Sequence, residues 1–218
     1  TFRPPFTPLT FGVIVGRNVG EFFDITRKTP MHEWHVKQNA KFENVGQWKR
    51  AWYYPKKNEN MHQAVQRESK AARDSAGILD ASTLGKIDIQ GTDASEFLNR
   101  VYTNAWSKLE IGKCRYGLML NEDGMVYDDG VTTRLNENHY IMTTTTGGAA
   151  NVLSKLEEYL QTEWPELDVY FTSVTDHYAT VSICGPNSKK ILSKVIPDLD
   201  LTDDKFPHMS FKNAIIDK

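Results

Sequence analysis

Apolar and polar residues alternate on either side of a short polar turn in the middle of the chain. An apolar, aromatic run at 116–120 leads into Asn121-Glu122-Asp123-Gly124, and a second run follows at 125–131. A period of two is typical of a strand with one buried face. Glycine at the turn can take the positive φ that a tight turn requires. The pattern predicts a β-hairpin over about residues 113–134.

Apolar positions spaced three and four residues apart predict helices elsewhere, with short alternating runs between them. The predicted helices span residues 60–76, 92–102, 149–161 and 186–195, and a short capped helix is expected after Thr29 and Pro30. Further strands are predicted at 86–90, 139–145, 168–174, 178–184 and 210–216. Short helices that alternate with hairpins indicate an α+β fold, with a mainly antiparallel sheet and flanking helices.

The first 28 residues lack this periodicity, and Pro4, Pro5 and Pro8 block regular hydrogen bonding there. We expect 1–28 to be an extended arm or a linker from a preceding domain, and 29–218 to be the N-terminal portion of a truncated domain. The chain starts at Thr1 without methionine and stops within the last predicted strand. These ends predict a fragment of a longer protein.

Composition narrows the class of partner. The chain has 26 basic and 28 acidic residues and a net charge of −2, so we expect no nucleic-acid partner. Because no apolar run is long enough to span a membrane and no signal peptide is visible, we expect no membrane partner and a cytoplasmic location.

The residues that commonly bind metals have unsuitable spacing. Cys114 and Cys184 stand far apart within apolar runs, so we expect two small buried side chains and no disulfide or zinc site. His32 and His35 are three residues apart, whereas the metallohydrolase motif HExxH places its histidines four apart. We therefore expect no metal site, and structural or surface histidines.

Two adjacent carboxylates, Asp128 and Asp129, interrupt the second arm of the hairpin. Aspartate is disfavoured in strands, and neighbouring side chains on a strand face opposite ways. The two residues therefore cannot form a close acid pair. One interpretation is a polar strand end, with one carboxylate capping a neighbouring loop. The other is a single pocket-facing carboxylate that acts as a base or anchors a ligand.

Several short motifs stand in the order seen in one family. They are Thr29-Pro30, His35, Gly46-x-Trp48, Tyr54, Gly77-Ile78-Leu79-Asp80-Ala81-Ser82, Thr103-Asn104, Tyr116-x-x-Met119-x-Asn121-x-x-Gly124-x-x-x-Asp128-Asp129 and Gly185-Pro186. With them the chain resembles, over about residues 25–218, the folate-binding domains of the glycine cleavage T-protein (aminomethyltransferase) family. The segments 1–5, 27–30 and 47–50 are similar, more narrowly, to α subunits of heterotetrameric sarcosine oxidases, in which a dinucleotide-binding region precedes such a domain.

The resemblance implies a tetrahydrofolate site with Asp129 as its catalytic residue. Tyr116 matches a tyrosine that lines the folate, and Val131 faces the same side as Asp129. Leu84 stands where the family has a methionine that contacts the folate, and Met209 stands where a tyrosine is expected. The family's downstream glutamate and arginine contacts would fall beyond residue 218.

The narrower resemblance implies conversion of tetrahydrofolate and a small amine-derived imine into 5,10-methylenetetrahydrofolate. It also implies other subunits of a hetero-oligomeric oxidase as partners, with flavin and NAD bound elsewhere in the complex. A lipoyl-dependent aminomethyltransferase is an alternative, although the family's usual Asn-Asp is Asn104-Ala105 here. A catalytically silent folate-binding or assembly module is another.

Overall fold

A computed structural model describes residues 10–16 and 27–216. In the segment 1–28, predicted to be extended, Phe11–Val15 forms a short helix, α1, and Arg27–Lys28 forms strand β1. The motif at 1–5 lies outside the described residues. The α+β fold class is confirmed, because antiparallel sheets with flanking helices make up the described part of the chain.

The largest element is a five-stranded antiparallel sheet in the order β6-β7-β8-β5-β9. Its strands, in chain order, are β5 (Gly85–Gln90), β6 (Cys114–Leu120), β7 (Val126–Asn136), β8 (His139–Thr144) and β9 (Tyr170–Ser173). The predicted hairpin is β6 and β7, which pair antiparallel around Gly124 with its φ of 81°. The period-two pattern thus identified the hairpin correctly.

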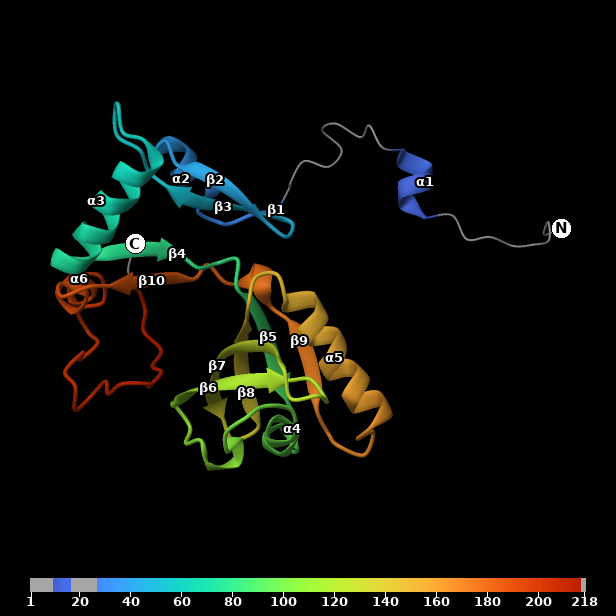
Figure 1. Ribbon diagram of the computed structural model, residues 1–218. Coiled ribbons are helices and arrows are strands. Elements are labelled where there is room, and N and C mark those ends of the chain that lie inside the picture. Colours follow the sequence, from blue (N-terminus) through green and yellow to red (C-terminus); the bar gives the residue numbers. More distant parts are fainter. Residues whose placement is uncertain (1–9, 17–26, 217–218) are drawn as a thin grey trace.

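Two helices cover one face of this sheet and form the core with it. They are α4 (Ala94–Val101) and α5 (Ala149–Thr162), which lie beside the sheet in Figure 1. Phe97 and Leu98 of α4 and Val152 and Leu156 of α5 are fully buried. They pack in one apolar cluster with side chains of the sheet and of the 3-10 turn at Trp106–Lys108. Alternate residues of β5 (Ile87 and Ile89) and β8 (Tyr140 and Met142) contribute to it, as burial of one sheet face requires.

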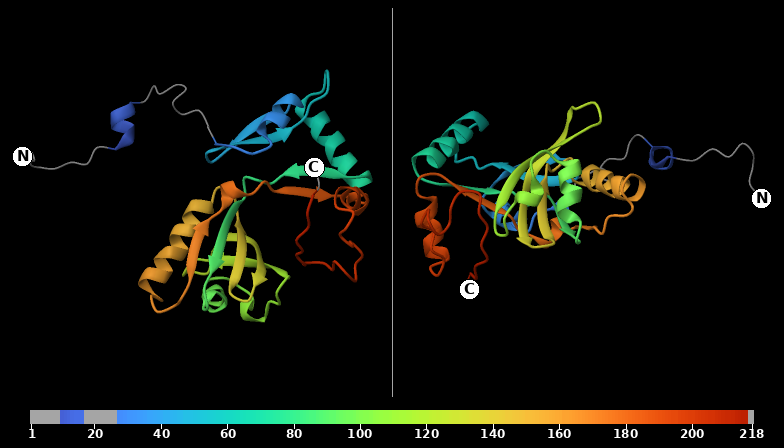
Figure 2. Two further views of the ribbon diagram at one scale, coloured as in Figure 1. Left: turned by 180° about the vertical axis from the view of Figure 1, so that it is seen from behind. Right: turned by 90° about the horizontal axis from the view of Figure 1, so that it is seen from below.

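A second group of elements packs beside the large sheet. The strands β1, β3 (Trp48–Tyr53) and β2 (Lys41–Val45) form a three-stranded sheet, and β10 (Val181–Cys184) pairs with β4 (Gly77–Asp80). The helices are α2 (His32–Lys37), α3 (Met61–Asp74) and α6 (Ser188–Val195). Figures 1 and 2 show β4 and β10 between the two larger sheets. The chain passes from β4 directly into β5, so the turn at 81–84 joins the two groups.

A buried polar chain ties α2 to this turn. The His35 ring binds the Asp80 carboxylate through Nε2 at 2.7 Å, and Nδ1 lies 2.7 Å from the Tyr54 hydroxyl. The second Asp80 oxygen accepts a hydrogen bond from the Ser82 backbone N–H. Burial alone would raise the pKa of Asp80, but hydrogen bonds from groups that include Ser82 and His35 outweigh it and hold the pKa below its usual value. His35 is thus a structural histidine.

Three local expectations are wrong. Residues 210–216 form no strand: Met209, with a φ of 56°, lies in the turn before Ser210, and only an isolated bridge between Lys113 and Ser210 follows. The helix expected after Thr29 begins only at His32 and has no side-chain cap. The cysteines are not buried, since Cys114 is half-buried and Cys184 is exposed.

The capping signal that sequence analysis missed is at the start of α3. Asn60 accepts from the Gln63 backbone N–H, and the Gln63 side chain accepts from the Asn60 N–H. This reciprocal pair satisfies two helix-end donors that would otherwise lack partners.

Two histidine–aspartate pairs allow a matched test of the buried chain. We expect His35→Ala to lower the free energy of unfolding by about 3 kcal/mol or more, because Asp80 would remain buried without its partner. The His139–Asp88 pair is more exposed, with side-chain exposures of 32% and 16% against 2% and 4%. His139→Ala should therefore cost less than about 1 kcal/mol. Urea unfolding monitored by tryptophan fluorescence measures the stability of both variants. Equal losses of stability would contradict the structural role of His35.

Candidate functional site

Strand register places the predicted site residues on one face of the β6–β7 hairpin. Tyr116 pairs with Val131 and Leu118 with Asp129. Directly paired residues share a face, so these four side chains lie together. Tyr116 is 64% exposed and Leu118 43%, Asp129 is exposed and Val131 half-buried. The structure therefore brings Tyr116, Asp129 and Val131 together on the face opposite the core.

Asp128 lies on the other face, opposite Met119, and is only 5% exposed. Its Oδ1 accepts from the Thr145 hydroxyl at 2.6 Å, and its Oδ2 accepts from the Thr145 backbone N–H at 3.2 Å. The expected absence of a close acid pair is confirmed. Asp128 binds the β8–α5 loop, while Asp129 has no hydrogen bond or ion pair among the described residues.

The regular pairing of β7 with β8 ends close to Asp129, at Thr132. The paired residues run from Thr132 and Met142 to Asn136 and His139, with a register shift after Arg134. A Cβ on Gly130 would lie 1.8 Å from the Thr143 carbonyl oxygen. The two backbones therefore approach too closely at Gly130 for any side chain. At this point the Thr143 hydroxyl makes the hydrogen bonds of the Val131 backbone. It accepts from the Val131 N–H at 2.9 Å and donates to the Val131 carbonyl oxygen at 3.2 Å.

Leu84 lies in the turn before β5. The Lys86 ammonium group is buried and donates to the carbonyl oxygens of Ser82 and Leu84, at 3.1 and 2.8 Å. Burial lowers the pKa of Lys86, and the nearby negative charges of Asp80 and Asp176 offset only part of this effect. The turn is linked to the β8–α5 loop, because the Thr83 and Thr146 hydroxyls lie 3.0 Å apart. Leu84 is thus connected to the Asp128 side of the hairpin through this loop.

Met209 lies at the other end of β6. Its carbonyl oxygen accepts from the Cys114 N–H at 2.8 Å, and its side chain borders a recess with Arg115 and His208. Cys114 is two residues before Tyr116 and shares its face. Met209 therefore lies near the start of β6. It and Leu84 border separate recesses, neither of which is lined by Tyr116, Asp129 or Val131.

Tyr116 is held in place by Asn104. The Asn104 side chain donates to the Tyr116 carbonyl oxygen, and Asn104 has a φ of 86°. Asparagine tolerates this left-handed conformation better than most residues. Ala105, which follows, accepts a hydrogen bond from the Arg115 guanidinium through its carbonyl oxygen. Residues 104–105 thus support the backbone of β6.

The arrangement of this face suits a flat ligand with N–H groups. An aromatic ring and aliphatic side chains offer a surface against which a planar ring can lie. The Asp129 carboxylate beside them accepts hydrogen bonds or a proton. Among the described residues no group of three or more histidines, cysteines or acids could hold a metal ion.

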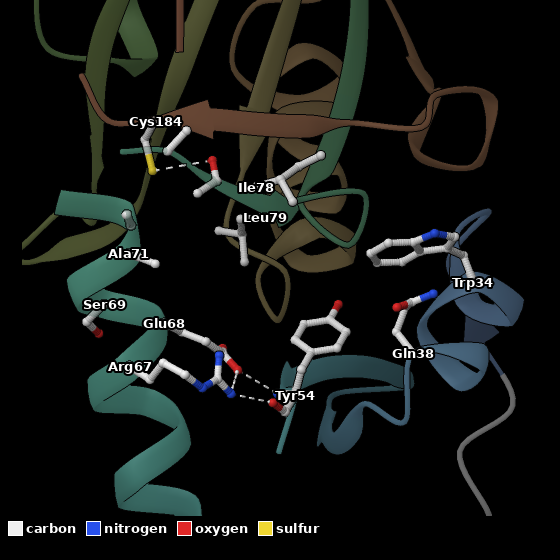
Figure 3. Close-up of a pocket in the computed structure, with 13 residues that line it drawn as sticks. Trp34, Gln38, Tyr54, Arg67, Glu68, Ser69, Ala71, Ile78, Leu79 and Cys184 are labelled. Atoms are coloured by element: carbon white, nitrogen blue, oxygen red, sulfur yellow. Dashed lines mark hydrogen bonds and ion pairs between the residues drawn. The ribbon is translucent and has the colours of Figure 1, made fainter. Parts of the chain in front are cut away.

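A separate apolar pocket of about 510 Å³ lies in the second group of elements (Figure 3). Trp34 and Tyr54 face Ile78 and Leu79 across it, with Arg67 and Glu68 of α3 at one side. The Tyr54 hydroxyl belongs to the His35–Asp80 chain, and burial together with the charges of Asp80 and Glu68 raises its pKa to about 12. None of the predicted site residues lines this pocket.

The aromatic residues at 48–54 differ in their exposure to solvent. Trp48 is buried under the Arg27 guanidinium, whose Cζ lies 4.1 Å from the ring centroid, whereas Trp52 is half-exposed.

No helix in the described part of the chain is long and apolar enough to cross a membrane.

A family model described as "GCVT N-terminal domain" matches residues 31–218. Among curated proteins, "Sarcosine oxidase subunit alpha" of Corynebacterium sp. (strain P-1) is 58% identical over 217 residues, and the protein of that name from Rhizobium meliloti (strain 1021) is 48% identical over 215 residues. These matches cover 100% and 98% of this chain and 22% of each relative. The chain therefore spans about a fifth of their length.

More distant similarity extends to aminomethyltransferases. The "Aminomethyltransferase" of Listeria monocytogenes serotype 4a (strain HCC23) is 31% identical over 179 residues, which cover 82% of this chain and 46% of the relative. The crystal structure of glycine cleavage system aminomethyltransferase T from Bartonella henselae superposes with a TM-score of 0.68 at 26% identity. The superposition covers 78% of this chain and 43% of that one. Both resemblances found in the sequence are confirmed.

The close approach at Gly130 predicts a steep local cost. We expect Gly130→Ala to lower the free energy of unfolding by about 3 kcal/mol, because the new methyl group would force β7 away from β8. Gly147→Ala is the matched control in the neighbouring loop, where a Cβ would meet nothing within 4 Å. Its effect should stay within about 0.5 kcal/mol. Chemical denaturation of both variants provides the comparison, and wild-type stability of Gly130→Ala would refute the close packing.

Proposed function

The chain belongs to the GCVT N-terminal domain family, and we propose on that premise that it is the folate-dependent one-carbon transfer module of a sarcosine oxidase-type α subunit. Identity of 48–58% to sarcosine oxidase α subunits over nearly the whole chain carries this proposal. Identity to the aminomethyltransferase from Listeria is much lower, at 31%. The whole protein would combine residues 29–218 with further domains and with other subunits that bind flavin and NAD.

In the proposed reaction, the methylene carbon of a small amine-derived imine would form bonds to two nitrogens of tetrahydrofolate, which gives 5,10-methylenetetrahydrofolate. The bonds between that carbon and the imine nitrogen would break, and the nitrogen would leave as the free amine with the two protons that the folate nitrogens lose. When bound, tetrahydrofolate supplies the nucleophilic nitrogens that carry the carbon. Tyr116 and Val131 offer the surface against which its pterin ring lies. The family resemblance adds Leu84 and Met209 as further folate contacts, and the two residues border separate recesses.

Asp129 has two properties that suit a base. Its carboxylate stands beside Tyr116 and Val131, and it has no competing partner among the described residues. A carboxylate within hydrogen-bond reach of an attacking nitrogen can accept the proton that the nitrogen loses. It also stabilises positive charge near the reacting carbon. Asp128 is unsuited to either role, because both its oxygens are engaged by Thr145.

The lipoyl-dependent aminomethyltransferase is the second candidate, supported by the superposition on the enzyme from Bartonella. The position after Asn104 is alanine here, where the family usually has aspartate. An assay with aminomethylated carrier protein distinguishes the two. Methylenetetrahydrofolate formed from that donor, and none formed from the imine, would favour the aminomethyltransferase.

We expect Asp129→Asn, in the whole protein that contains this chain, to lower folate-dependent methylene capture by about 10²–10⁴-fold, the contribution typical of one acid–base group. Amine oxidation should continue and release the carbon as formaldehyde. Glu137→Gln, which neutralises another exposed carboxylate at the end of β7, is the control and should behave as wild type. Quantifying methylenetetrahydrofolate and formaldehyde together tests this. An unchanged yield in Asp129→Asn would favour a catalytically silent module.

The openness of the hairpin face predicts weak binding by this chain alone. Binding pockets usually enclose about 70–90% of a ligand's surface, whereas Tyr116, Leu118 and Asp129 lie on an open face. We expect the dissociation constant for tetrahydrofolate to be weaker than about 10 µM, because one face supplies only part of the contact energy. Isothermal titration calorimetry measures it, and submicromolar affinity would show that the chain holds a complete pocket.

A further inference from the structure

The clamp between Asp128 and Thr145 lies directly behind the proposed catalytic carboxylate. Asp128 is adjacent to Asp129 in sequence but faces the packed side of the sheet. Both of its oxygens bind Thr145, and the Thr145 hydroxyl in turn accepts from the Gly148 backbone N–H at 3.2 Å. The three residues therefore form one connected unit between β7 and the start of α5.

Both Thr145 groups that meet Asp128 are hydrogen-bond donors. One is the backbone N–H, and the other is the hydroxyl, whose oxygen also accepts from the Gly148 N–H. Only a group with two acceptors satisfies this pair. Asparagine has only one oxygen, so its NH₂ group would face one of the two Thr145 donors. A carboxylate offers a separate oxygen to each donor and therefore suits this position. A Cβ on Gly148 would lie 3.0 Å from Asp128 Oδ1, which shows how closely the loop fits.

The clamp also attaches β7 to the β8–α5 loop beyond the point where the regular β7–β8 ladder ends. The β6–β7 register shifts between Met119 and Leu120, next to Asp128, and the ladder to β8 has already ended at Thr132. Met125 and Val126, nearer the tip, are strongly exposed. Regular strand pairing therefore holds the segment around Asp129 on one side only.

We propose that Asp128 and Thr145 are positioning residues that set the direction of the Asp129 carboxylate, an inference that rests on the proposed function. By fixing the backbone of residue 128 against the β8–α5 loop, they fix the Cα–Cβ direction of the next residue. Asp129 then stands beside Tyr116 with its carboxylate directed away from the core. Loss of the clamp lets the strand segment rotate and moves the carboxylate relative to the ligand.

A purely structural role is the competing explanation. Gly148 is the N-cap residue of α5, and a carboxylate near a helix N-terminus is stabilising. Such a role would change how much enzyme is folded. It would not change how Asp129 acts within folded enzyme, and a double-mutant cycle separates the two.

The experiment uses the whole protein with its partner subunits. We expect Thr145→Val, which loses the hydroxyl, to lower kcat for folate-dependent methylene capture by about 10–100-fold, as misplacement by about 1 Å can do. The KM for tetrahydrofolate should change by less than about threefold, since Tyr116 and Val131 still form the contact surface. Thr145→Ser keeps both hydrogen bonds of the hydroxyl and should return to near the wild-type rate.

The cycle adds Asp129→Asn to each variant. If Thr145 acts through Asp129, Thr145→Val should change the residual rate of Asp129→Asn by less than about twofold. Gly148→Ala is a second route to the same test, because its methyl group presses on the clamp without removing a hydrogen-bonding group. Gly147→Ala is its control. If Thr145→Val does not fold, Gly148→Ala alone tests whether the clamp acts through Asp129.

Two outcomes overturn the inference while leaving the proposed function intact. One is a wild-type rate in both Thr145→Val and Gly148→Ala. The other is an equal loss from these changes in the wild-type and Asp129→Asn backgrounds. A wild-type rate in Asp129→Asn itself would instead contradict the proposed function.

Discussion

A side chain on a β-strand can face only one side of its sheet, and the organisation of this chain depends on that constraint. In the five-stranded sheet, Met119 and Met142 face α4 and α5 in the core, while Tyr116 and Asp129 face the opposite side. Asp128 and Asp129 are therefore assigned to different environments although they are adjacent. A slip of one residue in β7 would exchange them. The packing of the core thus also determines which carboxylate remains available to a ligand.

Departures from regular pairing are concentrated next to that carboxylate. Gly130 brings β7 and β8 so close that their ladder cannot continue in the usual way, and a threonine hydroxyl bonds the backbone instead. On the other edge of β7 the register with β6 shifts near the turn. Such irregularities are common beside functional sites, because they redirect side chains that a regular sheet would hold straight. Residues 128–131 keep their regular pairs with β6, whereas their bonds on the β8 side involve the side chains of Asp128, Thr143 and Thr145.

Local pattern was sufficient to predict most elements of this fold. Period-two alternation identified β6 and β7, and helical spacing identified α3, α4 and α5 close to their observed bounds, because each buries one face against a common core. The strand expected at 210–216 failed for a reason that pattern cannot show. Met209 adopts a positive φ, and Gly112 and Cys114 take up the hydrogen bonds of the segment around it. The prediction that both cysteines are buried was wrong for a similar reason, because apolar neighbours in the sequence do not ensure burial in the folded chain.

The candidate site was predictable in part. Alternation alone separated Asp128 from Asp129, and the family resemblance then selected Asp129. The partner of Asp128 was not predictable, because Thr145 lies 17 residues away and meets it only after β7 and β8 have formed. The Thr143 and Thr145 hydroxyls both bind groups of β7, so neither contact could be read from the sequence alone.

Buried charges hold the turns around this face. Lys86 binds the carbonyl oxygens of Ser82 and Leu84, Asp80 binds the Ser82 N–H, and Asp128 binds Thr145. Burying a charge is costly unless it is fully hydrogen-bonded, and a turn has backbone groups that lack ladder partners. Each charge therefore satisfies turn groups that regular structure leaves unpaired, and those groups offset its desolvation. Because single side chains make these attachments, loss of any one of them would leave buried turn groups without a hydrogen-bond partner.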